Sequence, residues 1–152
     1  MSDSTYFMLR IAVDFDGTIV ENAYPGIGNE NLFAFHTLRE LQKRGILLIL
    51  WTYRVGKELD EAVEFCRQNG VEFYAVNKNH PEEVYDPAVY SRKIDADIYI
   101  DDKNVGGFPG WSLIWQMIDL DGIYRSGGQI EKQMIRQTKK SFFSRIFGRD
   151  KE

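Results

Sequence analysis

Acidic or hydroxyl side chains follow three apolar runs of this sequence, at the point where each run ends: Asp14 and Asp16, Thr52, and Asp101 with Asp102. Carboxylates gathered in one crevice repel each other, and a divalent cation is the simplest compensation. All-oxygen ligands favour a hard ion, and Mg²⁺ takes few carboxylates while it keeps waters and a substrate phosphate. With a nearby lysine added, such a group meets the requirements of phosphoryl transfer.

The segments around these residues alternate between strand and helix patterns. Short apolar runs predict strands over 9–15, 46–51, 71–76 and 97–100. Helical spacing predicts helices over 32–44, from 59 to a stop at Gly70, and over 113–118, with a loop and one helical turn over 77–95. Asn29 or Asn31 is expected to cap the first helix.

This alternation predicts an α/β fold with three layers, in which a parallel sheet has helices on both faces. Sites in such sheets form outside the carboxyl ends of the strands, where the acids and Thr52 are expected to meet. Each acid taken alone also fits a helix cap or a turn. Independent caps need not converge on one sheet edge, so we favour the functional interpretation.

Three motifs resemble those of the haloacid-dehalogenase-like (HAD) superfamily. Asp14-Phe15-Asp16-Gly17-Thr18 is similar to its motif I, Leu48-Ile49-Leu50-Trp51-Thr52 to its motif II, and Ile98-Tyr99-Ile100-Asp101-Asp102 to its motif IV. The segment Ser91-Arg92-Lys93 and the run from Ile100 to Gly107 resemble small bacterial HAD-type hydrolases. The resemblance implies a HAD-like Rossmannoid fold and a phosphate monoester hydrolase.

The resemblance also implies a role for each site residue. Asp14 is expected to attack phosphorus and form an aspartyl-phosphate, and Asp16 to act as acid and then as base. Mg²⁺ is expected to bind the Asp14 carboxylate, the Asp16 main-chain carbonyl and Asp102 directly, and Asp101 through water. Thr52 and nearby N–H groups would hold phosphate oxygens.

Two lysines remain candidates for the phosphate-binding cation. Lys93 lies shortly before the fourth predicted strand, the spacing of HAD-type nucleotidases, and is favoured. Lys78 follows the third predicted strand, a spacing that other HAD members use. Sequence spacing alone does not fix which of them reaches the site.

The windows in which HAD enzymes carry a cap domain, here 18–29 and 77–95, are too short to hold one. The chain therefore resembles the capless class, whose open site admits a bulky substrate or is closed by a neighbouring subunit in a homo-oligomer. The expected substrate is a phosphorylated small molecule or the phosphorylated end of a macromolecule. The side chains expected to line the mouth are Tyr24, Tyr53, Arg54, Tyr85 and Tyr90.

Length, composition and charge indicate the domain organisation and the location of the protein. A length of 152 residues indicates one catalytic domain, placed at 1–128, and a basic amphipathic helix or tail at 129–152. The net charge of −4 argues against nucleic-acid binding as the main activity. One cysteine, no signal-peptide pattern and no apolar run long enough for a membrane span favour the cytoplasm.

Two other functions remain open at this stage. The chain could be a non-catalytic module that binds metal and phosphate and docks a partner or a membrane through its tail. Because surface helices are normally amphipathic, a tail packed on the domain is favoured over membrane contact. A phosphate-receiver domain ranks last, because its phosphorylated Asp would end a central strand where this chain has Thr52 or Val76-Asn77.

Overall fold

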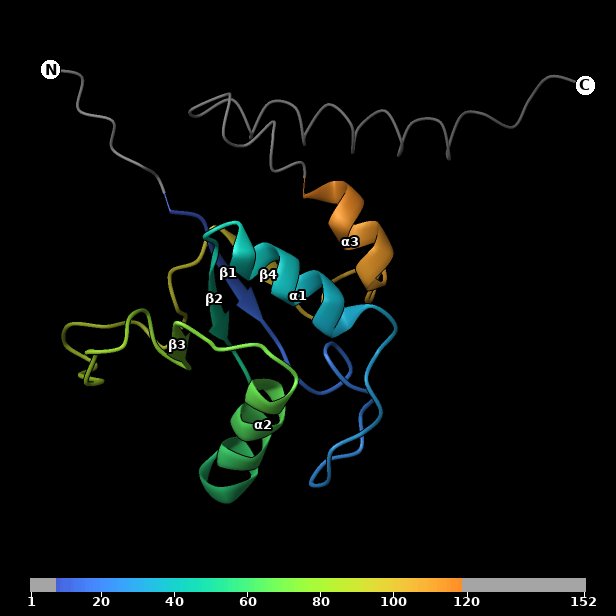
Figure 1. Ribbon diagram of the computed structural model, residues 1–152. Coiled ribbons are helices and arrows are strands. Elements are labelled where there is room, and N and C mark those ends of the chain that lie inside the picture. The colour runs from blue at the N-terminus through green and yellow to red at the C-terminus, as the bar shows by residue number, and fades with distance from the viewer. Residues whose placement is uncertain (1–7, 119–152) are drawn as a thin grey trace, which may run out of the picture. The chain divides into compact units, whose positions relative to one another are not determined.

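The computed structural model describes residues 8–118, which contain a parallel sheet and three helices (Figure 1). The strands are β1 Arg10–Val13, β2 Leu47–Leu50, β3 Ala75–Val76 and β4 Ile98–Ile100. Their order in the sheet is β3-β2-β1-β4, and every pair is parallel. The α/β class with a parallel sheet is therefore confirmed, whereas helices on both faces stay a prediction.

The helices are α1 Ala34–Lys43, α2 Gly56–Gln68 and α3 Trp111–Met117, and Figure 1 shows α1 in front of the sheet. The apolar positions Phe35, Leu38 and Leu41 of α1 are buried, as their spacing predicted. Leu32, also expected on this face, precedes the helix and is 76% exposed.

The predicted caps of α1 are wrong. The helix starts after Phe33, which has a left-handed backbone with a φ of 67° and makes no side-chain cap. The amide of Asn31 instead donates to the Thr18 carbonyl at 3.0 Å, and Glu30 accepts the Phe35 N–H at 3.1 Å. A glutamate thus satisfies one of the unpaired N–H groups of the first turn.

β3 is shorter than the run 71–76 predicted. The Val71 N–H still donates to the Cys66 carbonyl at the end of α2, and the Glu72 N–H donates to the Gln42 side chain. Pairing with β2 begins only at Tyr74, whose N–H donates to the Leu48 carbonyl at 2.8 Å. The helix end and a glutamine side chain therefore take donors that a longer strand would use.

One face of the sheet is covered by the irregular segment 77–97. Ala12, Ile49 and Ala75 are register partners on three neighbouring strands and so share a face. Ile94, only 2% exposed, packs against them in one buried cluster. The segment connects strands at opposite edges of the sheet. It carries a turn in which the Glu83 N–H donates to the His80 carbonyl and a helical turn in which the Tyr90 N–H donates to the Asp86 carbonyl.

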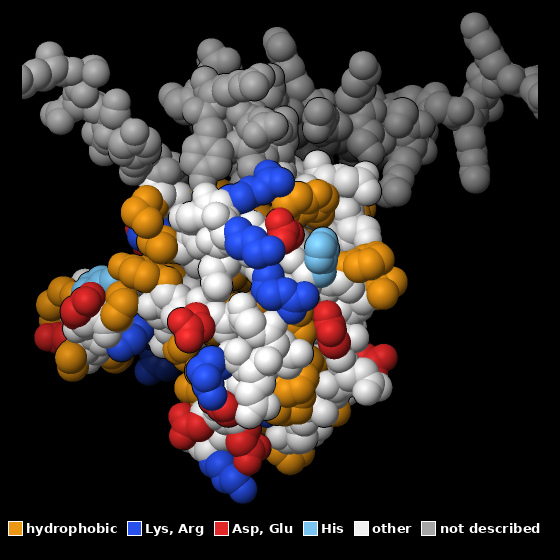
Figure 2. Space-filling model, in the orientation of Figure 1, with side chains coloured by type: hydrophobic (Ala, Val, Ile, Leu, Met, Phe, Trp, Pro, Cys, Tyr) orange, Lys and Arg blue, Asp and Glu red, His pale blue; other side chains and the backbone are white. Residues whose placement is uncertain are grey.

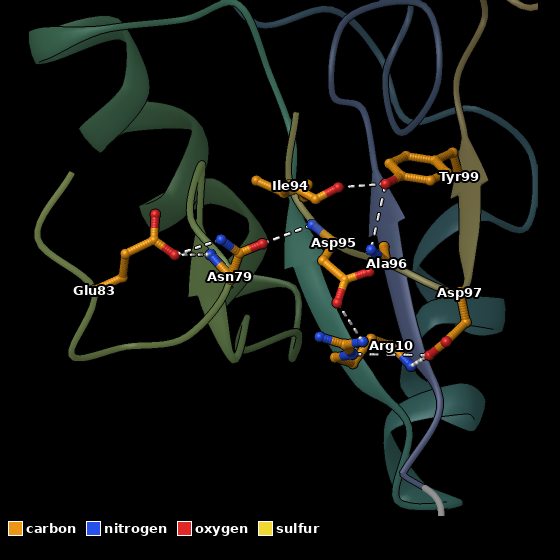
Figure 3. Close-up of polar contacts among 8 residues, drawn as sticks. All are labelled: Arg10, Asn79, Glu83, Ile94, Asp95, Ala96, Asp97 and Tyr99. Atoms are coloured by element: carbon orange, nitrogen blue, oxygen red, sulfur yellow. Dashed lines mark hydrogen bonds and ion pairs between the residues drawn. The ribbon is translucent and has the colours of Figure 1, made fainter. Parts of the chain in front are cut away.

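Figure 3 shows how this segment is anchored beside β1 and β4. The Tyr99 hydroxyl donates to the Ile94 carbonyl and accepts the Ala96 N–H. In the same stretch, the Arg10 guanidinium lies 3.0 Å from Asp95 and 3.8 Å from Asp97. These contacts fix the point where the chain enters β4.

A second group of contacts in Figure 3 holds the start of the segment. Asn79 accepts the Asp95 N–H at 2.6 Å and donates through its own amide to Glu83 at 2.6 Å. Glu83 also accepts the Asn79 main-chain N–H and is 8% exposed. The side chain of Asn79 therefore joins the two ends of a loop that has no helix to support it.

The outer face of α2 carries exposed ion pairs, Lys57 with Glu61 at 3.5 Å and Arg67 with Glu64 at 2.7 Å. Figure 2 shows basic and acidic side chains mixed over this part of the surface, which is typical of a solvated helix face. Cys66 lies on the opposite, buried side, and burial raises the pKa of its thiol to about 12.

Of the described residues, those up to Ile114 belong to one compact unit, and those from Trp115 to Ile118 are divided from it. The predicted tail, 129–152, lies outside the described residues, as does the proposed boundary at 128. Within residues 8–118, no helix has both the length and the apolar character needed to cross a membrane.

Replacing Ile94 with alanine should lower the free energy of unfolding by about 2–5 kcal/mol, because it leaves a cavity between the loop and the sheet. Val89→Ala in the same segment is the control, since Val89 is 69% exposed and a change of under about 0.5 kcal/mol is expected. Urea unfolding of both variants measures the difference. Equal effects would show that Ile94 does not cover the sheet.

Candidate active site

The candidate site lies at the carboxyl ends of β1 and β4, which are neighbours in the sheet. The chain passes from β1 to β2 and β3 in one direction and returns to the other side of β1 as β4. Ligands bind at such reversal points in open α/β sheets. The Asp14 N–H donates to the Ile100 carbonyl at 2.9 Å, so the ladder between β1 and β4 continues to the first acid of the site.

Three of the predicted acids meet here. Each of Asp14, Asp101 and Asp102 offers a carboxylate oxygen, and these oxygens all lie within 4.8 Å of one another. Burial raises the pKa of Asp14 to about 7 from 3.8, and the charges of Asp101 and Asp102 add to this rise. Hydrogen bonds from the Phe15 N–H and the Thr18 hydroxyl act in the opposite direction. The cluster is therefore crowded with negative charge.

Thr18 joins the two loops that carry these acids. Its buried hydroxyl donates to Asp14 Oδ2 at 3.1 Å and accepts the Asp102 N–H at 3.0 Å. Its carbonyl accepts the Asn31 amide at 3.0 Å and the Trp111 indole N–H at 2.9 Å. The residue at the end of motif I thus sets the distance between the nucleophile candidate and the second loop.

Gly17 allows the two loops to approach. It has a φ of +82°, and a Cβ built on it would lie 2.8 Å from the Asp102 carboxyl carbon. Any side chain at this position would therefore strain the backbone and push Asp102 away from Asp14.

The acids fit a hard divalent cation. Asp102 Oδ1 is buried and has no hydrogen-bond partner among the described residues, while Oδ2 accepts from Lys103 at 2.9 Å. Such an orphaned acceptor is costly unless an ion or water takes its lone pairs. Carboxylate oxygens from Asp14, Asp101 and Asp102 are the ligand type that Mg²⁺ prefers.

The Asp16 side chain does not join this cluster. Both of its oxygens accept from the Arg54 guanidinium, Oδ2 from Nε and Oδ1 from Nη2, each at 2.7 Å. Only the main-chain carbonyl of Asp16 was expected to bind the metal, and that expectation stays a prediction. Arg54, which was expected to line the mouth of the site, is buried and only 1% exposed.

Thr52 lies at the end of β2, and its main-chain N–H donates to the Asn77 side chain at 2.8 Å. Its hydroxyl accepts the Arg54 N–H at 3.3 Å, an arrangement that leaves the hydroxyl proton for another acceptor. Asn77 follows β3 and has a left-handed backbone with a φ of 52°. The ends of β2 and β3 are therefore linked beside the site.

Neither predicted lysine makes a hydrogen bond or ion pair to the four acids in the described part of the chain. The Lys93 ammonium lies over the Tyr99 ring, 5.3 Å from its centroid, and Lys78 donates to the Pro81 carbonyl at 2.6 Å. Lys103 is the cation that the structure brings to the cluster. Its hydrogen bond with Asp102 raises the pKa of its ammonium, and the charges of Asp14 and Asp101 act in the same direction.

The tyrosines expected at the mouth have different surroundings. Tyr53 is fully exposed beside Thr52, and Tyr24 is 59% exposed with its ring over Arg54, 5.3 Å away. Tyr85 is 50% exposed, and Tyr90 packs edge-on against His80. Of these, Tyr24 and Tyr53 contact or adjoin residues of the site.

Sequence reasoning missed the roles of Thr18, Asn77 and Lys103. Thr18 is the last residue of the motif I segment, Asn77 follows the third strand, and Lys103 follows the acid pair. A search for polar residues at the last position of each marked segment and one position beyond it would have found all three.

Replacing Gly17 with alanine should lower the free energy of unfolding by at least about 2 kcal/mol, from backbone strain and contact with Asp102. Gly45→Ala is the matched control, because Gly45 has a φ of +80° and nothing lies within 4 Å of its added Cβ. Urea unfolding separates the two costs. If both variants lose the same stability, the close approach to Asp102 is contradicted.

Asp14 should make stability depend on pH when no metal is present. Its pKa is 3.8 unfolded and about 7 folded, so between these values only the folded protein holds the proton. The free energy of unfolding should therefore fall as pH rises from about 4 to 7, by at most about 1.4 kcal/mol per unit.

This pH dependence is measured by urea unfolding in EDTA from pH 5 to 8, as the difference between wild type and Asp14→Asn. As pH rises, the free energy of unfolding of wild type should fall relative to that of Asp14→Asn. Mg²⁺ should restore wild-type stability at pH 8. A difference that does not change with pH would contradict the burial of Asp14.

Comparisons with known proteins place the chain in a family. No protein-family model matches it, and no curated protein does. Among solved structures, it is similar to a conserved protein coded by a locus from Bacteroides thetaiotaomicron, with a TM-score of 0.70 and 54% sequence identity. The match covers 76% of this chain and 93% of that one. The chain therefore belongs to the same family as this conserved Bacteroides thetaiotaomicron protein.

Proposed function

We propose that the chain is a Mg²⁺-dependent phosphate monoester hydrolase of the HAD type, which acts through an aspartyl-phosphate on Asp14. The observation that carries the proposal is the meeting of Asp14, Asp101 and Asp102 within 4.8 Å at the carboxyl ends of β1 and β4. These acids are 87 and 88 positions apart in the chain, counted from Asp14. The orphaned Asp102 Oδ1 supports a cation among them.

The acids would divide the chemistry between them. The Asp14 carboxylate attacks phosphorus, the ester P–O bond breaks, and the leaving oxygen takes a proton from Asp16. Water then attacks the aspartyl-phosphate, Asp16 accepts its proton, and inorganic phosphate leaves with the Asp14 carboxylate restored. Asp14, Asp102 and the Asp16 carbonyl would hold Mg²⁺, with Asp101 through water. The ion supplies positive charge for the acids and the phosphate.

Other residues would bind the phosphate oxygens. Thr52 keeps a hydroxyl proton for donation, and Lys103 brings an ammonium to the acid cluster. Lys103 therefore joins Lys93 and Lys78 as a candidate cation, and its contact with Asp102 favours it. A phosphate dianion beside three carboxylates needs such a charge in addition to the metal.

The described segments between the strands support an open site. Residues 14–33 and 77–97 hold no helix and no named strand, so no cap domain covers the carboxyl ends of β1 and β4 in the described residues. The substrate would be a phosphorylated small molecule or the phosphorylated end of a macromolecule. A second subunit that closes the site and a cytoplasmic location, which the single buried cysteine fits, are parts of the same proposal.

The test is hydrolysis of p-nitrophenyl phosphate with and without Mg²⁺. Wild type should be active with Mg²⁺ and inactive in EDTA, and Asp14→Asn should lose at least about a thousand-fold in kcat because the nucleophile is gone. Asp60→Asn, an exposed position on α2, is the matched control and should keep wild-type activity.

Two results would overturn the proposal. One is activity in Asp14→Asn equal to that of wild type, which would rule out the assigned nucleophile. The other is no phosphate release from any phosphate ester by the folded, Mg²⁺-loaded wild type. If the second result is found, Mg²⁺ binding by calorimetry that is lost in Asp102→Ala would indicate a metal-binding module in place of an enzyme.

A further inference from the structure

Arg54 is the most completely enclosed charged side chain near the site. Its five N–H donors all have acceptors: Asp16 takes two, and the carbonyls of Pro25, Gly26 and Glu58 take the others. The guanidinium carbon lies 5.0 Å from the Phe15 ring centroid and 5.3 Å from that of Tyr24. The guanidinium is therefore fixed in position and in orientation.

The contacts of Arg54 join two segments of the chain. Phe15, Asp16, Pro25 and Gly26 lie at two places in the connection between β1 and α1, and Glu58 belongs to the first turn of α2. Arg54 itself follows Thr52 by two residues, and its main-chain N–H donates to the Thr52 hydroxyl. The residue thus contacts the predicted phosphate-binding threonine through its main chain and the predicted acid/base through its side chain.

Stability alone does not explain such a pair. Taking two charges out of water costs several kcal/mol per ion, and apolar side chains of similar size often serve a fold as well or better. If Arg54 served only to hold the loop at 24–26 in place, the hydrogen bonds to Pro25 and Gly26 would be sufficient. The two bonds to Asp16 go beyond this, because they fix both oxygens of one carboxylate in a single plane.

We propose, on the basis of the function proposed above, that Arg54 is a positioning residue that holds Asp16 as the base for hydrolysis of the aspartyl-phosphate. The bidentate contact uses one lone pair on each oxygen of Asp16, so a second remains on each to accept a proton. In this step the water oxygen bonds to phosphorus, the bond from phosphorus to Asp14 breaks, and the water proton goes to Asp16. Inorganic phosphate is released.

The contact between Arg54 and Asp16 should affect the two half-reactions differently. To act as an acid in the first step, Asp16 must carry a proton on an oxygen that now accepts from Arg54. A substrate with a good leaving group needs little help from this acid, whereas the second step needs the base whatever the leaving group was. Loss of Arg54 should therefore slow the second step more than the first when p-nitrophenyl phosphate is the substrate.

The experiment traps the aspartyl-phosphate by acid quench during steady-state turnover of radiolabelled p-nitrophenyl phosphate with Mg²⁺. Arg54→Met removes the donors at similar size, and Arg54→Lys keeps the charge but not the bidentate contact. Arg67→Met is the matched control, because Arg67 makes the same kind of paired contact with Glu64 on the exposed face of α2. Thermal unfolding of each variant shows which of them is folded.

In both Arg54 variants kcat should fall about a hundred-fold or more, while the fraction of protein trapped as phosphoenzyme rises well above that of wild type. Combining Arg54→Met with Asp16→Asn should cost little beyond Asp16→Asn alone, because both act on one step. Arg67→Met should match wild type. If Arg54→Met does not fold, Arg54→Lys carries the test.

Other results separate the two proposals. A fall in kcat without more trapped phosphoenzyme in a folded Arg54 variant would show a merely structural role and overturn this inference alone. The proposed function would stand, provided that Asp16→Asn still accumulates phosphoenzyme. If wild type hydrolyses no phosphate ester, or if Asp14→Asn is trapped as readily as wild type, the proposed function falls and this inference falls with it.

Discussion

The approach of the loop after β1 to the loop after β4 is the contact on which the candidate site depends. Parallel pairing already brings the carboxyl ends of these strands together, and the Thr18 hydroxyl then joins Asp14 to the main chain of Asp102. Gly17 permits the approach because it has no side chain to meet Asp102. The same closeness crowds the acids, and the raised pKa of Asp14 is its electrostatic result.

Much of this arrangement follows from patterns that a sequence displays directly. The run that became β2 is continuously apolar, the run that became β1 is apolar from Ile11 to Val13, and Ile11, Val13 and Leu50 are fully buried in them. Because parallel strands end at one edge, residues that follow such runs must gather, which is why Asp14 and Asp102 could be expected together. The third strand was predicted too long, because Val71 and Glu72, the first residues of the predicted run, donate to the end of α2 and to a glutamine side chain.

Contacts that depend on irregular segments could not be predicted. The side chain of Arg54 is enclosed in part by the loop at 24–26, and its partner Asp16 is 38 positions away. Similarly, Lys78 and Lys93 belong to the crossover 77–97, which has no periodic pattern to fix where a side chain points. Lys103 directly follows Asp102 and reaches the acids. The sequence alone does not show whether its side chain points toward the acids or away from them.

The edges of the sheet bear on how copies of this protein can associate. In the described part of the chain the edge strands β3 and β4 have two and three residues, fewer than the four of each inner strand. A long edge offers unpaired N–H and C=O groups as a template for strand addition, and edges this short offer few. A subunit that covers the open site would therefore dock through loops and side chains, not by extending the sheet.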